Sequence, residues 1–256
     1  MNKPTPREAW RVAALTMMTA EELHFALQGD DAAAWVEAAA ECGLVEAQLR
    51  LGRMLLEGEG TLRHYENALA CFKAAAKSGN ADGHNMLGRC FENGWGTQKD
   101  FAAAAHHYRI AADAGLDWAQ YNLGHMLLSG IGVLQDRALA FAFYGLAAAQ
   151  GHVRAMNLMG RCYEQGWGVA RDLDAARVWY RRSAEGGYFR GAYNYADLLA
   201  SEGCLVGAKE WFARALSKAP EPSRNLMVTA LLAHKEPILR ALAKRNPEAR
   251  LRVWRE

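Results

Sequence analysis

The sequence predicts an all-α protein made of repeated helix pairs, on three observations. Alanine, the strongest helix former, fills 49 of the 256 positions, whereas Ile, Val and Thr together fill only 19, too few for a protein built on β-sheets. The six prolines lie near the two ends, so residues 7–219 contain none of the rings that interrupt helices. Glycine and aromatic residues recur every 36 residues along most of the chain, which indicates a repeat architecture.

Charge and cysteine content exclude several classes of protein. The formal net charge is only +2, which provides no field that would select nucleic acid. The five cysteines are scattered without a Cys-x-x-Cys motif, which favours reduced thiols in the cytoplasm over a disulfide framework. No apolar run approaches the roughly 18 residues of a membrane span. We therefore expect a cytoplasmic protein with no membrane span and no nucleic-acid partner.

The first expected elements are N-terminal helices in residues 1–44. Thr19 and Glu22 have the spacing of a capping box, in which two side chains bond free backbone N–H groups at the start of a helix. Basic residues before a mildly apolar stretch at 12–20 leave a signal peptide as the alternative, but no convincing cleavage site follows. Residues 31–43 resemble the second helix of a degenerate repeat.

Five repeats follow in residues 45–217, each predicted as two antiparallel helices, and the fifth lacks four residues of its loop. The first helix has an apolar face and an interior glycine, which predicts that two backbones approach too closely for a side chain. A Gly-x-Gly loop supplies positive φ angles, an Asp caps the second helix, and an aromatic residue of that helix faces the core. The interior glycines are Gly52, Gly88, Gly124 and Gly160, the capping residues are Asp100, Asp136 and Asp172, and the aromatic residues are Phe72, Tyr108, Tyr144, Tyr180 and Phe212.

Residues 119–124, the loop 130–133, Asp136 and residues 144–151 resemble the Sel-one-like repeat (SLR), a relative of the tetratricopeptide repeat. The resemblance covers about residues 45–217. It implies a right-handed α/α superhelical solenoid of five to six helix hairpins that acts as an adaptor in protein complexes and is common in bacteria. It does not indicate one particular partner.

The resemblance also implies a concave binding groove. In related repeats, the first helix lines the groove through the positions three before and one after the interior glycine. Asparagine can bond a peptide backbone, arginine can bind carboxylates and tyrosine offers rigid contact area, so the expected partner is a protein or peptide with acidic side chains or a free carboxylate. The alternative is a solvated polar face without a partner. The candidate groove residues at these positions are Arg53, Asn85, Arg89, Tyr121, His125, Asn157, Arg161 and Tyr193, and Arg154 and Arg190 lie one turn earlier.

The second and fourth repeats match each other more closely than they match their neighbours. Residues 87–96 and 159–168 are nearly identical at a spacing of 72 residues. The hypothesis is that they form two equivalent contact patches, and the alternative is a trace of duplication of a two-repeat block. The patches comprise Arg89, Glu92 and Trp95 in one repeat and Arg161, Glu164 and Trp167 in the other.

Other patterns that resemble sites are interpreted as structural. The Gly-x-Gly loops lack the third glycine and the preceding strand of a dinucleotide-binding motif. The adjacent His106 and His107 point about 100° apart on a helix, and His107 shares its repeat position with aromatic residues. Cys90 and Cys162 suit small buried hydrophobic positions. We therefore expect no catalytic residue, no metal and no cofactor.

The C-terminal region, 218–256, is expected to cap the last repeat. Residues 226–234 and 238–244 have the pattern of two amphipathic helices, and a solenoid needs its exposed end covered. The basic stretch 250–255 is a candidate for docking on an acidic partner or, more weakly, on anionic lipid; the alternative is a solvated tail.

Together these patterns predict a non-catalytic scaffold that captures a segment of a partner protein in its groove. One alternative is an inhibitor or immunity-type protein that blocks a bacterial effector through the same groove. Another is a hydrolase, although the sequence contains no arrangement of nucleophile and base that supports it.

Overall fold

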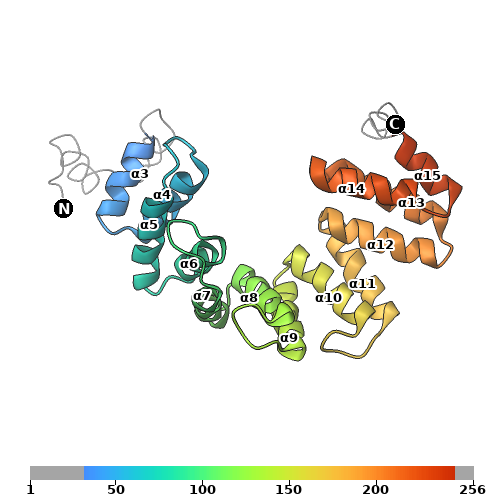
Figure 1. The fold of residues 1–256 in the computed structure, drawn as a ribbon, viewed down its shortest axis with the longest axis horizontal. Helices are drawn as coiled ribbons and strands as arrows, with labels where there is room; N and C mark the ends of the chain where they lie inside the picture. Colours follow the sequence, from blue (N-terminus) through green and yellow to red (C-terminus); the bar gives the residue numbers. More distant parts are fainter. Residues whose placement is uncertain (1–31, 246–256) are drawn as a thin grey trace. The chain divides into compact units, whose positions relative to one another are not determined.

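The computed structural model describes residues 32–245, which form α-helices joined by short loops and contain no strand (Figure 1). The chain divides into two compact units, residues 1–135 and 136–256. The predicted capping box at Thr19 and Glu22, the signal-peptide alternative and the basic stretch 250–255 lie outside the described residues. None of the described helices has the length and apolar character needed to cross a membrane.

Successive helices pack against each other within each unit, as the repeat pattern predicts. The first unit contains α3 (Ala32–Glu41), α4 (Val45–Glu57), α5 (Tyr65–Lys77), α6 (Ala81–Asn93), α7 (Phe101–Asp113) and α8 (Asp117–Ser129). The second contains α9 (Arg137–Ala149), α10 (Val153–Gln165), α11 (Leu173–Glu185), α12 (Phe189–Ser201), α13 (Leu205–Lys218), α14 (Glu221–Leu232) and α15 (Pro237–Lys244). The all-α class and the consecutive helix pairs are thereby confirmed.

The predicted N-caps are confirmed at all three aspartates. One carboxylate oxygen of Asp100, Asp136 and Asp172 accepts a hydrogen bond of 2.9 Å from the backbone N–H three residues later. Such a bond satisfies one of the donors that the first turn of a helix leaves free. In the first repeat the side chain of His64 takes the same place, since its Nδ1 accepts from the N–H of Asn67 at 3.3 Å.

The two glycines of each loop have the predicted positive φ angles, for example +76° at Gly94 and +69° at Gly96. The second glycine of the loop has a further reason to lack a side chain. A Cβ at Gly96 would collide with the carbonyl oxygen of Tyr65, and a Cβ at Gly168 would collide with that of Arg137. Each loop therefore lies directly on the start of the second helix of the preceding repeat.

The interior glycines of the first helices make room for an aromatic ring, so the prediction that two backbones meet there is wrong. A Cβ at Gly88 would lie 2.5 Å from the ring of Tyr108, and a Cβ at Gly160 would lie 2.5 Å from the ring of Tyr180. The ring of Phe72 covers Gly52 in the same way. These rings are fully buried or nearly so, which confirms the predicted core positions.

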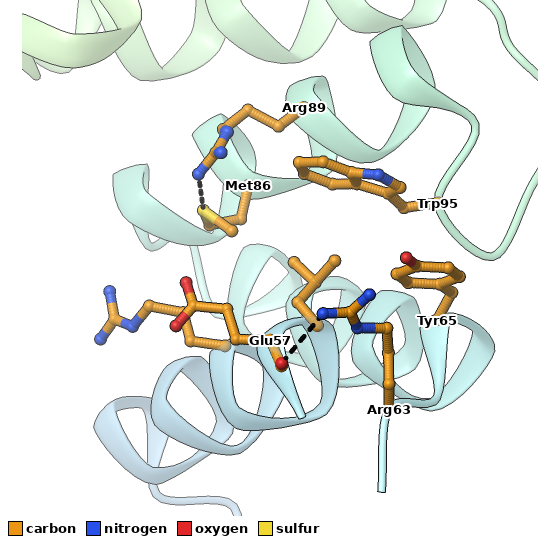
Figure 2. Close-up of a pocket in the computed structure, with 8 residues that line it drawn as sticks. Glu57, Arg63, Tyr65, Met86, Arg89 and Trp95 are labelled. Carbon is orange, nitrogen blue, oxygen red and sulfur yellow. Dashed lines mark hydrogen bonds between the residues drawn. The ribbon is translucent and has the colours of Figure 1, made fainter. Parts of the chain in front are cut away.

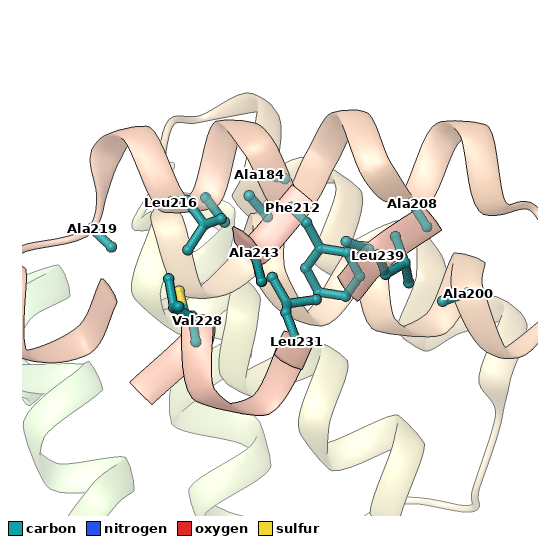
Figure 3. Close-up of a cluster of buried hydrophobic side chains, with 14 residues drawn as sticks. Ala184, Ala200, Ala208, Phe212, Leu216, Ala219, Val228, Leu231, Leu239 and Ala243 are labelled. Atoms are coloured by element: carbon teal, nitrogen blue, oxygen red, sulfur yellow. The ribbon is translucent and has the colours of Figure 1, made fainter. Parts of the chain in front are cut away.

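The last two described helices pack against α13. Val228 and Leu231 of α14 and Leu239 and Ala243 of α15 are buried in one cluster with Phe212 of α13 (Figure 3). The predicted start of the first capping helix at residue 226 is wrong. The helix begins at Glu221, because Pro222 fits the first turn of a helix, where no backbone N–H is needed.

We expect the substitution Gly160→Ala to destabilise the protein by about 1–3 kcal/mol, because the new methyl group would displace the buried ring of Tyr180. The matched control is Gly145→Ala in the middle of α9, where only the terminal methyl of Met159 lies within 4 Å of the new Cβ, at 3.9 Å. There alanine should stabilise the helix by roughly 0.5–1 kcal/mol. Urea unfolding measures both free energies, and two shifts in the same direction would contradict the ring-on-glycine contact.

Candidate functional site

A pocket of about 350 Å³ lies in the first unit between the first and second repeats (Figure 2). It brings together Arg53, Arg89 and Trp95, all three of which the sequence singled out. Arg63 and Tyr65, from the loop before α5 and its first residue, line it as well and were missed. The pocket is lined by Arg53, Leu56, Glu57, Arg63, Tyr65, Met86, Arg89 and Trp95.

The pocket carries an excess of positive charge, because three arginines line it beside one glutamate. An Nη2 of Arg63 donates to the backbone carbonyl of Glu57 at 3.1 Å. The guanidinium of Arg89 lies over the ring of Trp95 at 5.2 Å, and its Nη1 lies 3.6 Å from the sulfur of Met86. Within residues 32–245, Arg53, Arg63 and Arg89 form no ion pair with a carboxylate. Their charge is therefore available to a ligand.

The two near-identical segments of the second and fourth repeats form the same local structure. Arg161 lies over Trp167 at 5.0 Å, which reproduces the stack of Arg89 on Trp95. The hydroxyl of Tyr108 donates to Glu92 at 2.6 Å, and the hydroxyl of Tyr180 donates to Glu164 at 2.8 Å. The spacing of 72 residues thus corresponds to a repeated arrangement of four side chains.

Glu92 and Glu164 serve the interior of their repeats. Burial, reinforced by the neighbouring carboxylate, raises the pKa of Tyr108 and Tyr180 and keeps each phenol a hydrogen-bond donor. In the first repeat the two positions hold Leu56 and Phe72, so the carboxylate and the hydroxyl are absent together. In the third repeat they hold Leu128 and the buried Tyr144, so the pairing of carboxylate and hydroxyl is particular to the second and fourth repeats. Of the patch residues, Arg89 and Arg161 are exposed, and Trp95 and Trp167 are half-buried.

Asn85 and Asn157 lie between successive repeats and do not form an open groove surface. They are only 7% and 5% exposed. The side-chain oxygen of Asn85 accepts from Nδ2 of Asn122 at 3.0 Å, and that of Asn157 accepts from Nδ2 of Asn194 at 2.8 Å. Each bond joins the first helices of neighbouring repeats, so these asparagines hold the repeats together.

The remaining predicted groove residues are accessible and are divided between the two units. In the first unit, His125 is exposed and Tyr121 is half-buried beside Trp118. In the second unit, exposed arginines lie over aromatic rings of α12 and the turn before it. Arg154 lies 5.8 Å from the ring of Tyr188, Arg190 lies 5.7 Å from that of Phe189, and Tyr193 is half-buried against Phe212.

The structure pairs His107 with His84, which sequence reasoning missed because the two lie on different helices. Their Nδ1 atoms are 3.0 Å apart, and the His107 ring stacks on Phe91. Burial, then the neighbouring His84 and His106, lower the pKa of His107 to about 4, and burial also lowers the pKa of His84. Among the described residues, no group of three His, Cys, Asp or Glu side chains is placed to hold a metal ion.

The cysteines at the shared repeat position, Cys90 and Cys162, are fully buried. Burial raises the pKa of each thiol to about 11, which leaves the reactive thiolate scarce at neutral pH. The expectation that these cysteines act as small hydrophobic side chains is therefore confirmed.

We expect the histidine pair to make the protein less stable as the pH falls from about 6.5 towards 4. Their pKa values are lower in the folded chain than the ordinary 6.5, so the unfolded chain binds more protons in this range. Melting temperatures at pH 7.5 and 5.0 should differ more for the wild type than for His107→Phe, because the substitution removes one imidazole of the pair. Phenylalanine is chosen because Phe143 occupies the same position in the next repeat. His125→Gln is the control and should retain the wild-type difference. An unchanged difference in His107→Phe would refute this assignment.

Comparisons with solved structures identify the fold. A protective antigen of uropathogenic Escherichia coli with an SLR fold matches 98% of this chain at 25% identity with a TM-score of 0.75, and the chain spans 57% of that structure's length. A Sel1 repeat protein from Oxalobacter formigenes matches 93% of this chain at 22% identity, also with a TM-score of 0.75, and the match covers 100% of that structure's length. An immunity protein from Pseudomonas aeruginosa matches 82% of this chain at 18% identity with a TM-score of 0.55, and the match covers 78% of that structure's length.

No curated protein sequence matches the chain. The family model of the Sel1 repeat matches four consecutive segments, residues 45–80, 81–116, 119–152 and 153–188, which together cover more than half of the sequence. Proteins of this family are typically interaction scaffolds. The helix pairs, the loop glycines and the family model agree, and the chain belongs to the Sel1 repeat family.

Proposed function

We propose that the protein is a non-catalytic, cytoplasmic scaffold that captures an acidic segment of a partner protein. The observation that carries the proposal is the pocket of the first unit, where three arginines without ion pairs among the described residues surround an aromatic and apolar wall. An arginine can bind a carboxylate through two parallel hydrogen bonds, which gives it both affinity and geometric selectivity.

The surroundings of Arg89 favour binding over a purely solvated role. Stacking on Trp95 restricts the orientation of the Arg89 guanidinium and leaves its N–H edges available to a carboxylate. Tyr65 and Trp95 offer rigid contact area, and Leu56 and Met86 offer an apolar surface beside the charges. The preferred segment therefore carries Asp or Glu, or a free carboxylate, next to an apolar side chain.

The stack of Arg161 on Trp167 provides a second contact of the same chemistry in the other unit. A partner with two acidic segments would then bind through both units, and linked contacts strengthen each other without any new interaction. Tyr121, His125, Arg154, Arg190 and Tyr193 extend the accessible surface of their respective units.

We expect the double substitution Arg53→Glu/Arg89→Glu to weaken binding of the captured partner at least tenfold, because it places two like charges against an acidic segment. The tagged full chain is used to recover its partner from a cell extract, and the affinity of the purified pair is then measured by calorimetry. The matched control is Lys73→Glu, which reverses an exposed charge on α5 of the same unit away from the pocket.

Wild-type affinity in the double variant, with its helical content intact, would refute the pocket as the binding site. The variant Arg161→Glu tests the second contact separately, since it leaves the first unit unchanged.

A narrower form of this function is that of an immunity-type protein, in which the captured partner is a bacterial effector. The fold shared with an immunity protein of Pseudomonas aeruginosa supports considering it. The same recovery experiment distinguishes the two forms. An immunity protein should abolish the activity of its purified partner at equimolar ratio, whereas a scaffold should leave that activity intact.

A further inference from the structure

A second pocket, of about 470 Å³, lies in the second unit between α11, the start of α12 and α13. It is lined mainly by α11 and α13, the second helices of successive repeats, and Phe189 and Ala192 of the first helix α12 complete it. None of its residues was a sequence-based candidate. The apolar and basic side chains of its lining are Ala184, Phe189, Ala192, Trp211, Arg214 and Lys218.

Comparison with the preceding repeat shows which features are particular to this pocket. Trp211 and Arg214 stack at 4.5 Å, and the equivalent Trp179 and Arg182 stack at 5.0 Å, so the stack belongs to the repeat pattern. Two other positions differ. Ala192 stands where the preceding repeat has Met156, which leaves space, and Lys218 stands where it has Gly186, which adds a positive charge.

The pocket has an excess of positive charge. Glu185, the acidic residue in its lining, pairs with Arg181 at 3.4 Å. In the part of the chain that the structure describes, neither Arg214 nor Lys218 forms an ion pair. Both lie on one face of α13, four residues apart, beside the apolar surface of Phe189, Ala192 and Trp211.

We infer that this pocket binds a partner segment in which an aromatic side chain is flanked by Asp or Glu. The apolar floor receives the ring, and the carboxylates bind Arg214 and Lys218. Stacking on Trp211 holds the guanidinium of Arg214 in position before the ligand arrives, which reduces the conformational entropy lost on binding. The inference extends the proposed capture of acidic segments to a second site, but its test does not depend on the pocket of the first unit.

The test is calorimetric titration of the full chain with the peptide acetyl-Gly-Glu-Phe-Glu-Gly-amide. The titration uses the Arg53→Glu/Arg89→Glu background, so that binding at the first pocket cannot produce the signal. We expect binding that weakens at least tenfold when the glutamates of the peptide become glutamine and when its phenylalanine becomes alanine.

Two variants test the pocket itself. Ala192→Met should fill the space with the side chain that the preceding repeat carries and abolish binding without changing any charge. Arg214→Gln should weaken binding at least tenfold, whereas the control Lys209→Gln, which removes a charge from the same helix outside the lining, should bind as the background does. Unfolding temperatures confirm that each variant is folded.

Undetectable binding of the peptide at millimolar concentration overturns the inference, as does equal binding by Ala192→Met or by the glutamine peptide. Because the first pocket is already disabled in this background, these results leave the proposed function of the first unit intact. Conversely, unchanged partner binding by Arg53→Glu/Arg89→Glu in the earlier experiment does not affect this site.

Discussion

The structure depends on contacts between an aromatic ring of a second helix and a glycine inside the first helix of the same repeat, which occur in the first, second and fourth repeats. Tyr108 on Gly88 and Tyr180 on Gly160 show them most clearly, because no Cβ fits between ring and backbone. Glycine inside a helix destabilises the fold by about 1 kcal/mol relative to alanine, and burial of an aromatic side chain stabilises it by more than that. The ring joins the two helices of a hairpin, and the asparagine bonds and the loop glycines then join one hairpin to the next.

The candidate sites arise where individual repeats depart from this shared pattern. The positions that hold the framework, which are the buried rings, the glycines, the capping aspartates and the bridging asparagines, recur along the chain, whereas the positions around them differ from one repeat to the next. Arg89 with Trp95 recurs in only one other described repeat, and Ala192 opens a pocket where a methionine stands one repeat earlier. A regular framework thus supplies rigid positions, and a few substitutions on it create the candidate pockets.

Much of the framework was predictable because it depends on neighbours in the sequence. The capping bonds of Asp100, Asp136 and Asp172 span three residues, and the positive φ angles of the loop glycines are a local backbone property. The candidate site was predictable only in part. Arg53, Arg89 and Trp95 follow from repeat positions, but Arg63 and Tyr65 reach the pocket through the path of a loop. The burial of Asn85 and the pairing of His84 with His107 depend on contacts between different helices, which a pattern along one chain does not report.

The sequence by itself determined the all-α class, the period of 36 residues, the helix boundaries set by glycine and aspartate, and the family. These follow from local backbone preferences and from a repeat that makes each preference visible several times. Only the tertiary structure decided what the interior glycines contact, which asparagines are hidden, and where unpaired cations lie beside aromatic rings. The physical reason is that burial and charge pairing are properties of side chains brought together from separate helices. A repeat pattern identifies equivalent positions, but it does not show which of them face each other and which face solvent.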